Sequence, residues 1–566
     1  MAAPQSPAPS PQPLYAELHA HSCWSLREGA SSNDELIGRA RRLRYPALAL
    51  TDHDNLYGAM EFAQAAHERG LKPITGCELT IHDSRFTIHD STHVTVLAMT
   101  TDGYRNICRL LTRAYHTYGK DTPMVEKAWL FEHHEGLIVL SGCRNSEISL
   151  LLDPSLTLRA PSATSPAPDP SLTLRALKAP VERGSNSVLS PQSSVLAEAI
   201  ASEYRAVFGD RFYIELQHHD AFGDTVRVTA LAEFAERMGI EVVATNNAHY
   251  HVRQRHRVND VLVAIRHRLT LDSSHEVRRP NSEFFLKHPA EMAARFERYP
   301  RAISNTVAIA ERCTFDLTRD LPYRLPDYPV PDGATLDSHL RGICEPVFRR
   351  KYGSESEAIR IDARHRLDRE LELIEKHGLA GFFLVYWELL QLCNEVAYEL
   401  HGRDKDLAPD ERPVARGRGS SVSSIVCYLI GLSHIDPVKN NLYLERFLNE
   451  ELHSLPDIDL DFPRDIRDEL LKRVYDRFGK EHAAIVAAFP TYRFKNAVLD
   501  VGKALGLPMP VLAKLNKLGD NFASAYEVAR EMSYVPELKD LVGAPLWKDL
   551  IDICSQLAGF PRHIGQ

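Results

Sequence analysis

The sequence has no run of about 18 or more apolar residues, and residues 1–13 carry neither a basic cluster nor an apolar stretch. The first absence argues against a membrane-spanning helix, and the second argues against a secretory signal peptide. The nine cysteines are an odd number scattered without paired spacing, which argues against a disulfide framework. We therefore expect a cytoplasmic protein.

Length and charge set further limits. With 566 residues the chain exceeds what one hydrophobic core supports, so we expect about three domains. The net charge of −9 argues against a surface that coats nucleic acid uniformly, but it does not exclude a local basic channel. Residues 253–268 and 349–351 are candidate basic patches, although runs of charge are usually solvated faces.

The most informative stretch is residues 455–462, in which three aspartates alternate with apolar residues. On an extended strand alternate residues share a face, so we expect Asp457, Asp459 and Asp461 on one side. Carboxylates arranged in this way can hold a pair of Mg²⁺ ions for phosphoryl transfer. A calcium loop would need Gly where Phe462 stands, and a solvated acidic edge strand is the other structural alternative.

The upstream context favours phosphoryl transfer. Residues 416–421 read Arg-Gly-Arg-Gly-Ser-Ser and are followed by an apolar, helix-like run at 425–432. A Gly/Ser-rich loop that opens a helix presents free backbone N–H groups, and arginines beside it can bind phosphate oxygens. Such a loop alone is usually a flexible connector. Followed closely by the Asp-x-Asp strand, it predicts a triphosphate-binding site.

These two motifs resemble those of the alpha subunit of bacterial DNA polymerase III, the C-family polymerase. The resemblance implies that Asp457 and Asp459 are two of three catalytic aspartates and hold two Mg²⁺ ions; Asp461 is not counted, because some relatives lack it. It also implies a set of nucleotide-binding residues: Arg416, Gly417, Arg418, Gly419, Ser420 and Ser421. The sequences at 246–250 and 559–563 are more similar to the error-prone, damage-induced branch of the family.

The N-terminal half alternates short apolar stretches with helical ones. The strand-like stretches are residues 14–21, 46–51, 72–81, 93–99, 136–141, 211–217 and 240–245. A capping box at residues 32–35 starts the helix between the first two. Strands that alternate with helices predict parallel pairing, and seven of them favour a closed α/β barrel over an open sheet.

Polar residues stand just past the ends of these strands, where α/β barrels place their chemistry. The clusters are His-x-His at 19–21, Thr-Asp-His-Asp at 51–54, Gly-Cys-Glu at 76–78, Ser-Gly-Cys at 141–143 and Asn-Asn-Ala-His at 246–249. Converging imidazole, thiolate and carboxylate groups suit Zn²⁺, Mn²⁺ or Fe²⁺. A lone His-x-His would more often be structural, but five clusters at five strand ends favour a metal site.

This pattern resembles the PHP (polymerase and histidinol phosphatase) domain, the N-terminal module of the same polymerase family. The resemblance implies a site for up to three metals with the ligands His19, His21, Glu28, His53, Glu78, His93, Cys143 and His249. His93 fits least well, because it stands at the start of its apolar run. Asn247 stands where many relatives have aspartate, and an amide is a poorer metal ligand. We therefore expect this domain to be mainly structural.

The resemblance implies an α/β fold in three parts: a PHP-type (β/α)7 barrel over 14–284, an α+β palm similar to that of polymerase beta over 285–488, and a helical thumb over 489–566. Residues 1–13 are expected to be a disordered tail. Within the barrel, the Pro-, Ser- and Ala-rich stretch at about 153–194 contains a repeated octamer and predicts a disordered insertion.

Local patterns predict four elements in the second half. An amphipathic helix is expected at 358–378, and the apolar run at 381–387 is expected to pack in the core. A further helix is expected at 464–478, followed by a short strand at 483–489.

The activity implied by the resemblance is error-prone DNA synthesis, in which a primer 3′-hydroxyl attacks the α-phosphate of a deoxynucleoside triphosphate. Primer–template DNA is the implied partner, together with a sliding clamp and accessory subunits bound through parts that this sequence lacks. Because the family's third catalytic aspartate and fingers are also missing, we expect no primer extension by this chain alone. Two alternatives stay open: a PHP phosphoesterase or 3′–5′ exonuclease, and a non-catalytic fragment that binds DNA or polymerase subunits.

Overall fold

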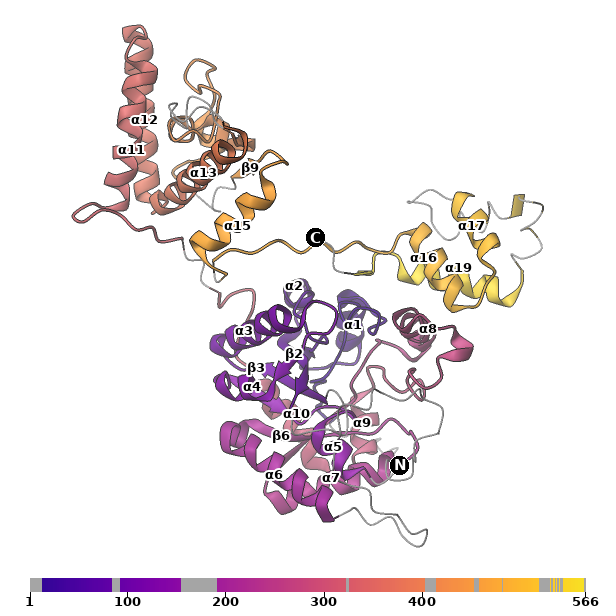
Figure 1. Ribbon diagram of the computed structural model, residues 1–566. Helices are drawn as coiled ribbons and strands as arrows, with labels where there is room; N and C mark the ends of the chain where they lie inside the picture. The colour runs from indigo at the N-terminus through magenta and orange to yellow at the C-terminus, as the bar shows by residue number, and fades with distance from the viewer. Residues whose placement is uncertain are drawn as a thin grey trace, which may run out of the picture. The chain divides into compact units, whose positions relative to one another are not determined.

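The computed structural model describes residues 13–83, 92–153, 191–321, 325–402, 414–451, 458–480, 482–518 and 543–563, with residues 530, 533, 534, 536 and 539. The chain divides into two compact units (Figure 1), Met1–Leu321 with Ala487–Gln566 and Pro322–Val486. Within the described ranges, no helix combines the length and the apolar character that a membrane span requires.

A curled mixed sheet lies at the centre of the first unit. Its strands follow in the order β1 (Ala47–Leu50), β2 (Lys72–His82), β3 (Thr92–Ala98), β5 (Leu137–Leu140), β6 (Phe212–Gln217) and β7 (Glu241–Thr245), and the short β4 (Val125–Glu126) pairs with β2.

The prediction of an all-parallel barrel is wrong at β3. This strand runs antiparallel to both β2 and β5, whereas β1 pairs parallel with β2, and β6 pairs parallel with β5 and β7. Residues 83–91, which join β2 to β3, are too few for the crossover that a parallel pair requires. The chain therefore returns in the opposite direction.

Residues 17–21 bond to both edges of this sheet. Ala49 N–H donates to Glu17 O (2.9 Å) on the β1 side, and His21 N–H donates to Ala248 O (2.7 Å) just after β7. The predicted strand at 14–21 is nevertheless reduced to isolated parallel bridges. One reason is that side chains accept some of its N–H groups, as Thr51 Oγ1 does from Ala20 (3.0 Å).

Helices pack against the sheet (Figure 1) and bury its aliphatic side chains. They are α1 (Asn33–Arg42), α2 (Ala59–Glu68), α3 (Thr101–Tyr118), α4 (Lys127–Glu132), α5 (Glu147–Leu152), α6 (Pro191–Phe208), α7 (Asp224–Met238), α9 (Pro289–Arg295) and α10 (Pro300–Arg312). The predicted capping box is confirmed, since Ser32 and Glu35 bond reciprocally at the start of α1. The predicted insertion lies outside the described residues between 154 and 190, but its last residues are helical because α6 begins at Pro191.

The rest of the first unit is helical. The helices α8 (His256–His267), α16 (Phe494–Ala504), α17 (Met509–Leu518) and α19 (Pro545–Leu557) share one hydrophobic cluster. The predicted strand at 483–489 is wrong. Residues 483–487 pair with no described strand, and Ile485 and Val486 are exposed. An extended chain there would have no neighbouring strand with which to form backbone hydrogen bonds.

The second unit consists of helices α11 (Leu336–Tyr352), α12 (Glu357–Lys376), α13 (Ala380–His401), α14 (Ile425–Leu429) and α15 (Arg467–Phe478) around a two-stranded ribbon, β8 (Arg416–Arg418) and β9 (Asp459–Asp461). The predicted helices at 358–378 and 464–478 are confirmed as α12 and α15. The apolar run at 381–387 opens α13, where Phe383 and Leu384 are fully buried in the core.

Candidate metal centre and nucleotide loop

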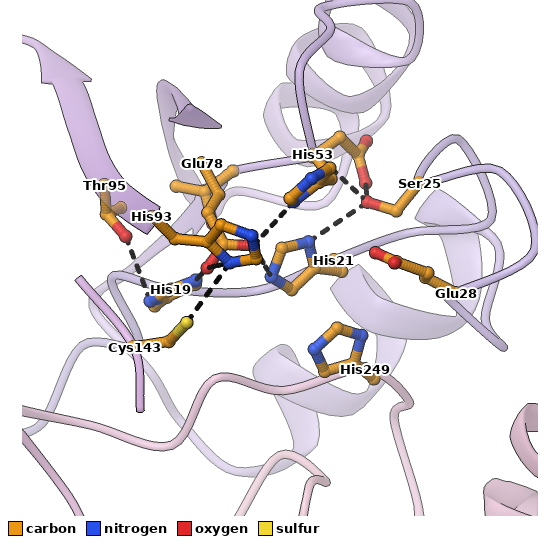
Figure 2. A network of polar contacts seen from close by, with 12 residues as sticks. His19, His21, Ser25, Glu28, His53, Glu78, His93, Thr95, Cys143 and His249 are labelled. Carbon is orange, nitrogen blue, oxygen red and sulfur yellow. Dashed lines mark hydrogen bonds and ion pairs between the residues drawn. The ribbon is translucent and has the colours of Figure 1, made fainter. Parts of the chain in front are cut away.

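The carboxylate of Glu78 is the centre of a histidine cluster (Figure 2). Its Oε1 lies 3.3 Å from His19 Nε2 and 3.4 Å from His93 Nδ1. Its Oε2 lies 2.8 Å from His53 Nδ1 and 3.7 Å from His21 Nε2. Two three-residue groups, one with His19 and His21 and the other with His53 and His93, therefore share Glu78, and each brings its ligand atoms within 4.8 Å of one another.

Backbone direction explains why these side chains converge. The segment that bridges the two sheet edges carries His19 and His21, and His53 follows the end of β1. Because β3 is antiparallel to β2, its beginning lies at the edge where the parallel strand β1 ends. His93 therefore joins the cluster even though it stands at the start of its strand.

Residues that sequence reasoning missed hold His19 in place. Its Nδ1 bonds to Glu215 Oε1 (2.7 Å) and also contacts Thr95 Oγ1 (3.1 Å), so Nε2 is turned toward Glu78. Gln217 Nε2 donates to the same Glu215 oxygen (2.8 Å), as does Thr245 Oγ1. A carboxylate that fixes the second nitrogen of a ligating histidine is the usual support for a metal ligand. The available signal was two polar residues, 215 and 217, at alternate positions of an otherwise apolar strand.

A second chain of contacts orients His21. Its Nδ1 lies 3.0 Å from Ser25 Oγ, and Ser25 Oγ donates to Asp52 Oδ1 (2.6 Å). Ser22 donates to the same carboxylate through both its N–H and its hydroxyl, each at 2.7 Å. Burial raises the pKa of Asp52, although these hydrogen bonds oppose the shift. The loop after His21 is therefore tied to the end of β1.

Charge is unevenly shared within the cluster. Burial alone would lower the pKa of His19, but the carboxylates of Glu215 and Glu78 outweigh it and raise that pKa to about 10. Burial would raise the pKa of Glu78, but neighbouring imidazoles, His93 first, hold it well below its usual range. Burial keeps the pKa of His21 well below its usual value, so this ring is neutral and suited to ligation.

Three atoms at the centre support a metal. His19 Nε2, His21 Nε2 and Glu78 Oε1 are buried and make no hydrogen bond within the described part of the chain, although His19 Nε2 and Glu78 Oε1 form the 3.3 Å ion pair. Buried polar atoms without partners are costly unless a ligand satisfies them. Two imidazole nitrogens and a carboxylate oxygen form a donor set that fits Zn²⁺, Mn²⁺ or Fe²⁺.

Cys143 and His249 lie at the margin of the cluster (Figure 2). Cys143 Sγ is 3.4 Å from His93 Nδ1, and burial raises the pKa of its thiol well above the usual value. The ring of His249 stacks on His21 at 4.2 Å between centroids. Neither belongs to the two groups around Glu78, so their ligation remains a prediction.

Glu28 and Asn247 also stand beside the centre. The Glu28 carboxylate forms an ion pair with Arg266 and is not among the ligand atoms that converge on Glu78. Asn247 is buried and adopts the left-handed backbone region with φ of 42°, which asparagine tolerates better than most residues. None of the described residues donates a hydrogen bond to its side-chain oxygen.

In the second unit, the ribbon brings the two predicted polymerase motifs together. Gly417 lies opposite Leu460 and Arg418 opposite Asp459 in the antiparallel register. Arg418 Nε also forms a 2.8 Å ion pair with Asp461 Oδ2. Asp459 and Asp461 are exposed, whereas Asp457 lies outside the described residues.

Hydrogen bonds to buried side chains hold one side of the Gly/Ser-rich loop and the start of α14 in place. Arg416, Arg418 and Gly419 are exposed, and the buried Ser421 hydroxyl donates to the carbonyl of Arg418 (2.8 Å). The fully buried carboxylate of Glu370 accepts bonds from the Ser424 hydroxyl and from the first N–H groups of α14. One side of the loop is thus anchored while its arginines face solvent.

Comparison with known protein families finds two separate matches along the chain. Residues 17–219 match the PHP domain family, and residues 338–566 match the family described as the bacterial DNA polymerase III alpha NTPase domain. The first match lies within the first unit, and the second covers most of the second unit and residues 487–566 of the first.

Curated relatives point the same way. The chain is 33% identical to an error-prone DNA polymerase of Symbiobacterium thermophilum and 34% identical to one of Mycobacterium bovis, each over 97% of its length. It is 30% identical over 98% of its length to the DNA polymerase III subunit alpha of Escherichia coli O6:H1. It spans 46%, 45% and 44% of these three proteins. The resemblance to bacterial DNA polymerase III alpha subunits is therefore confirmed, and two of these relatives carry the error-prone name.

Proposed function

We propose that this chain provides the nucleotide-binding loop and catalytic aspartates of an error-prone DNA-directed DNA polymerase. The main support is the β8–β9 pairing, which sets Arg418 of the loop beside Asp459 and Asp461. Carboxylates for metal ions next to an arginine for phosphate form the arrangement that phosphoryl transfer requires.

In this proposal Asp457 and Asp459 hold two Mg²⁺ ions, and the loop 416–421 holds the triphosphate. When bound, the ions would activate the primer 3′-hydroxyl and neutralise charge on the leaving pyrophosphate. The ion pair with Asp461 keeps the Arg418 guanidinium next to the carboxylates until a triphosphate oxygen replaces that partner.

The proposal extends to domains and partners. Residues 285–488 would form the first part of a palm, and residues 489–566 a thumb that holds primer–template DNA. Deoxynucleoside triphosphates are the proposed substrates, and a sliding clamp and accessory subunits are proposed partners.

The test is primer extension with Mg²⁺ and four deoxynucleotides, using the longest form of the protein that the gene encodes. We expect Asp459→Asn and Arg418→Ala each to lower extension by at least about 100-fold, because each removes a group that contacts the metal or the phosphates. Asp468→Asn, which changes an exposed carboxylate on α15, serves as the control. Undiminished extension by the Asp459 variant would contradict the proposal.

A second candidate function is a metal-dependent phosphoesterase or 3′–5′ exonuclease in the PHP domain. It is favoured by the three buried ligand atoms of His19, His21 and Glu78, which make no hydrogen bond to the described residues, whereas the neutral Asn247 favours a mainly structural role. A variant with both His19→Ala and His21→Ala should lose bound metal. Metal-dependent exonuclease activity that vanishes in this variant would refute the structural role, and full metal retention would refute the site itself.

A further inference from the structure

A cavity of about 560 Å³ opens between helices α11 and α12 of the second unit, which lie side by side (Figure 1). Cavities that bind small ligands usually measure about 300–1,000 Å³, so this one has room for a large side chain. The side chains that line it include Phe348 and Arg349 of α11, and Arg360, Ile361 and Arg364 of α12.

The apolar part of the cavity consists of Phe348 and Ile361. The Phe348 side chain is buried, and the Arg364 guanidinium carbon lies 3.9 Å from the centroid of its ring. Arg364 also donates to both carboxylate oxygens of Glu345, at 2.6 and 3.0 Å, so it is held in place as a wall of the cavity. Ile361 is 62% exposed and leaves apolar surface uncovered beside that wall.

Two arginines of the cavity have no partner of their own. Arg349 and Arg360 are exposed, and their side chains form no hydrogen bond or ion pair with the described residues. The charge of Arg364 is compensated by Glu345, so these two arginines leave the cavity with unbalanced positive charge. A free guanidinium matches a carboxylate through two parallel hydrogen bonds, which predicts an acidic partner.

The surroundings favour a short acidic segment over a nucleic acid. Glu357 and Asp362 are exposed on α12 and flank Arg360 and Ile361 along the sequence. A nucleic-acid backbone binds along a continuous run of cations, and these two carboxylates would repel it. A peptide with separate carboxylates and one apolar side chain matches both the localised charge and the apolar surface of the cavity.

We propose that the cavity between α11 and α12 binds an acidic peptide segment of another protein. One large apolar side chain of the peptide inserts beside Phe348 and Ile361, and flanking carboxylates pair with Arg349 and Arg360. An apolar anchor within a charged rim is the usual arrangement of a small protein interface. This inference goes beyond the proposed function, because none of these residues belongs to the nucleotide loop or to the metal centre.

The experiment is a fluorescence-anisotropy titration of the full chain with a labelled pentapeptide that has one phenylalanine between two pairs of glutamates. Replacing the phenylalanine of the peptide by alanine should weaken binding by roughly 10-fold or more, because the apolar anchor is lost. Arg349→Gln and Arg360→Gln should each weaken it by roughly 5-fold or more, since each removes a charge-assisted hydrogen bond. Ile361→Gln, which keeps the size of the side chain but not its apolar character, should also weaken it.

Arg341→Gln is the matched control, because Arg341 lies on α11, pairs with Asp368 and does not line the cavity. The unfolding midpoint is measured for every variant, and the replaced side chains at 349, 360 and 361 are exposed, so these variants should fold. The proposal is overturned if the unmodified chain does not bind the peptide, or if the three cavity variants bind it as well as the control does. An oligothymidylate that needs Arg349 and Arg360 for binding, while the peptide does not bind, would instead identify the cavity as a nucleic-acid site.

Discussion

Glu370 should make the nucleotide loop more stable in acid than in base. Its fully buried carboxylate accepts bonds from the Ile425 and Val426 N–H groups at 2.8 and 3.2 Å and from the Ser424 hydroxyl. Burial raises the pKa of Glu370 from 4.5 to about 7, because these bonds only partly offset desolvation. A pKa raised in the folded state stabilises the fold below the unfolded pKa of 4.5 and loses that effect as pH rises through about 7.

The magnitude follows from the two pKa values. Between about pH 5 and pH 8, the unfolded carboxyl is already ionised while the folded one still has to lose its proton. Integrating over this window gives a loss of about 2.5 kcal/mol in the free energy of opening. Glu370→Gln has the same shape as the protonated acid and cannot ionise, so it should lose none of this free energy.

Hydrogen exchange of peptides covering residues 419–432 measures the effect. Comparing the variant with the unmodified chain at the same pH cancels the intrinsic exchange rates. We expect similar protection at pH 5 and better protection of the variant at pH 8, with the difference shifting by about 2.5 kcal/mol. Glu372→Gln, an exposed change on the same helix, should produce no shift. A difference that stays constant between the two pH values would refute the reasoning.

Two substitutions test how tightly the site loops are packed, and a third serves as a control. Gly417→Ala should lower the free energy of unfolding of the second unit by about 1–3 kcal/mol and weaken nucleotide binding, because the added Cβ would lie 2.3 Å from Leu432 Cδ2. Urea unfolding measures the loss of stability, and titration with a fluorescent nucleotide measures the loss of binding. Gly29→Ala should lower metal content, because its Cβ would lie 1.7 Å from the carbonyl oxygen of Ser22 and force the metal-site loop to move. Gly38→Ala, on the open face of α1, should instead stabilise the chain by about 0.5–1 kcal/mol. Unchanged metal content in the Gly29→Ala variant would contradict the packing argument.

Which residues form the cluster around Glu78 could be predicted from the sequence better than how they are arranged. Local spacing identified His19, His21, His53 and Glu78 because polar residues at the ends of apolar strands are conspicuous. It could not reveal that Glu28 pairs with Arg266, because the two are far apart in the chain and meet only when α8 packs. Ion pairs between distant segments depend on tertiary contacts, which the spacing of residues along the sequence does not reveal.

The direction of strand β3 was the second feature that the sequence did not predict correctly. The pattern of alternating strands and helices predicted parallel pairing, and by that rule His93 stood at the wrong end of its strand. The rule failed because the stretch 83–91 between β2 and β3 is too short for a crossover helix. The same failure explains why His93 nevertheless lies in the cluster around Glu78, since reversing a strand moves its beginning to the other edge of the sheet. A residue that contradicts a topological rule can thus indicate that the topology itself is different.

The arrangement around Glu78 also explains why the centre needs support from further away. One carboxylate faces four imidazoles, and its two oxygens cannot satisfy all of them as charged groups. Glu215 supplies a second negative charge beside His19, while His21 is kept neutral by burial. A divalent ion bound beside Glu78 would supply the positive charge that protonated histidines otherwise supply. The histidines that bind the ion would therefore lose their protons as it binds. The buried carboxylate of Glu215 therefore supports the centre through His19, although the sequence pattern did not single it out.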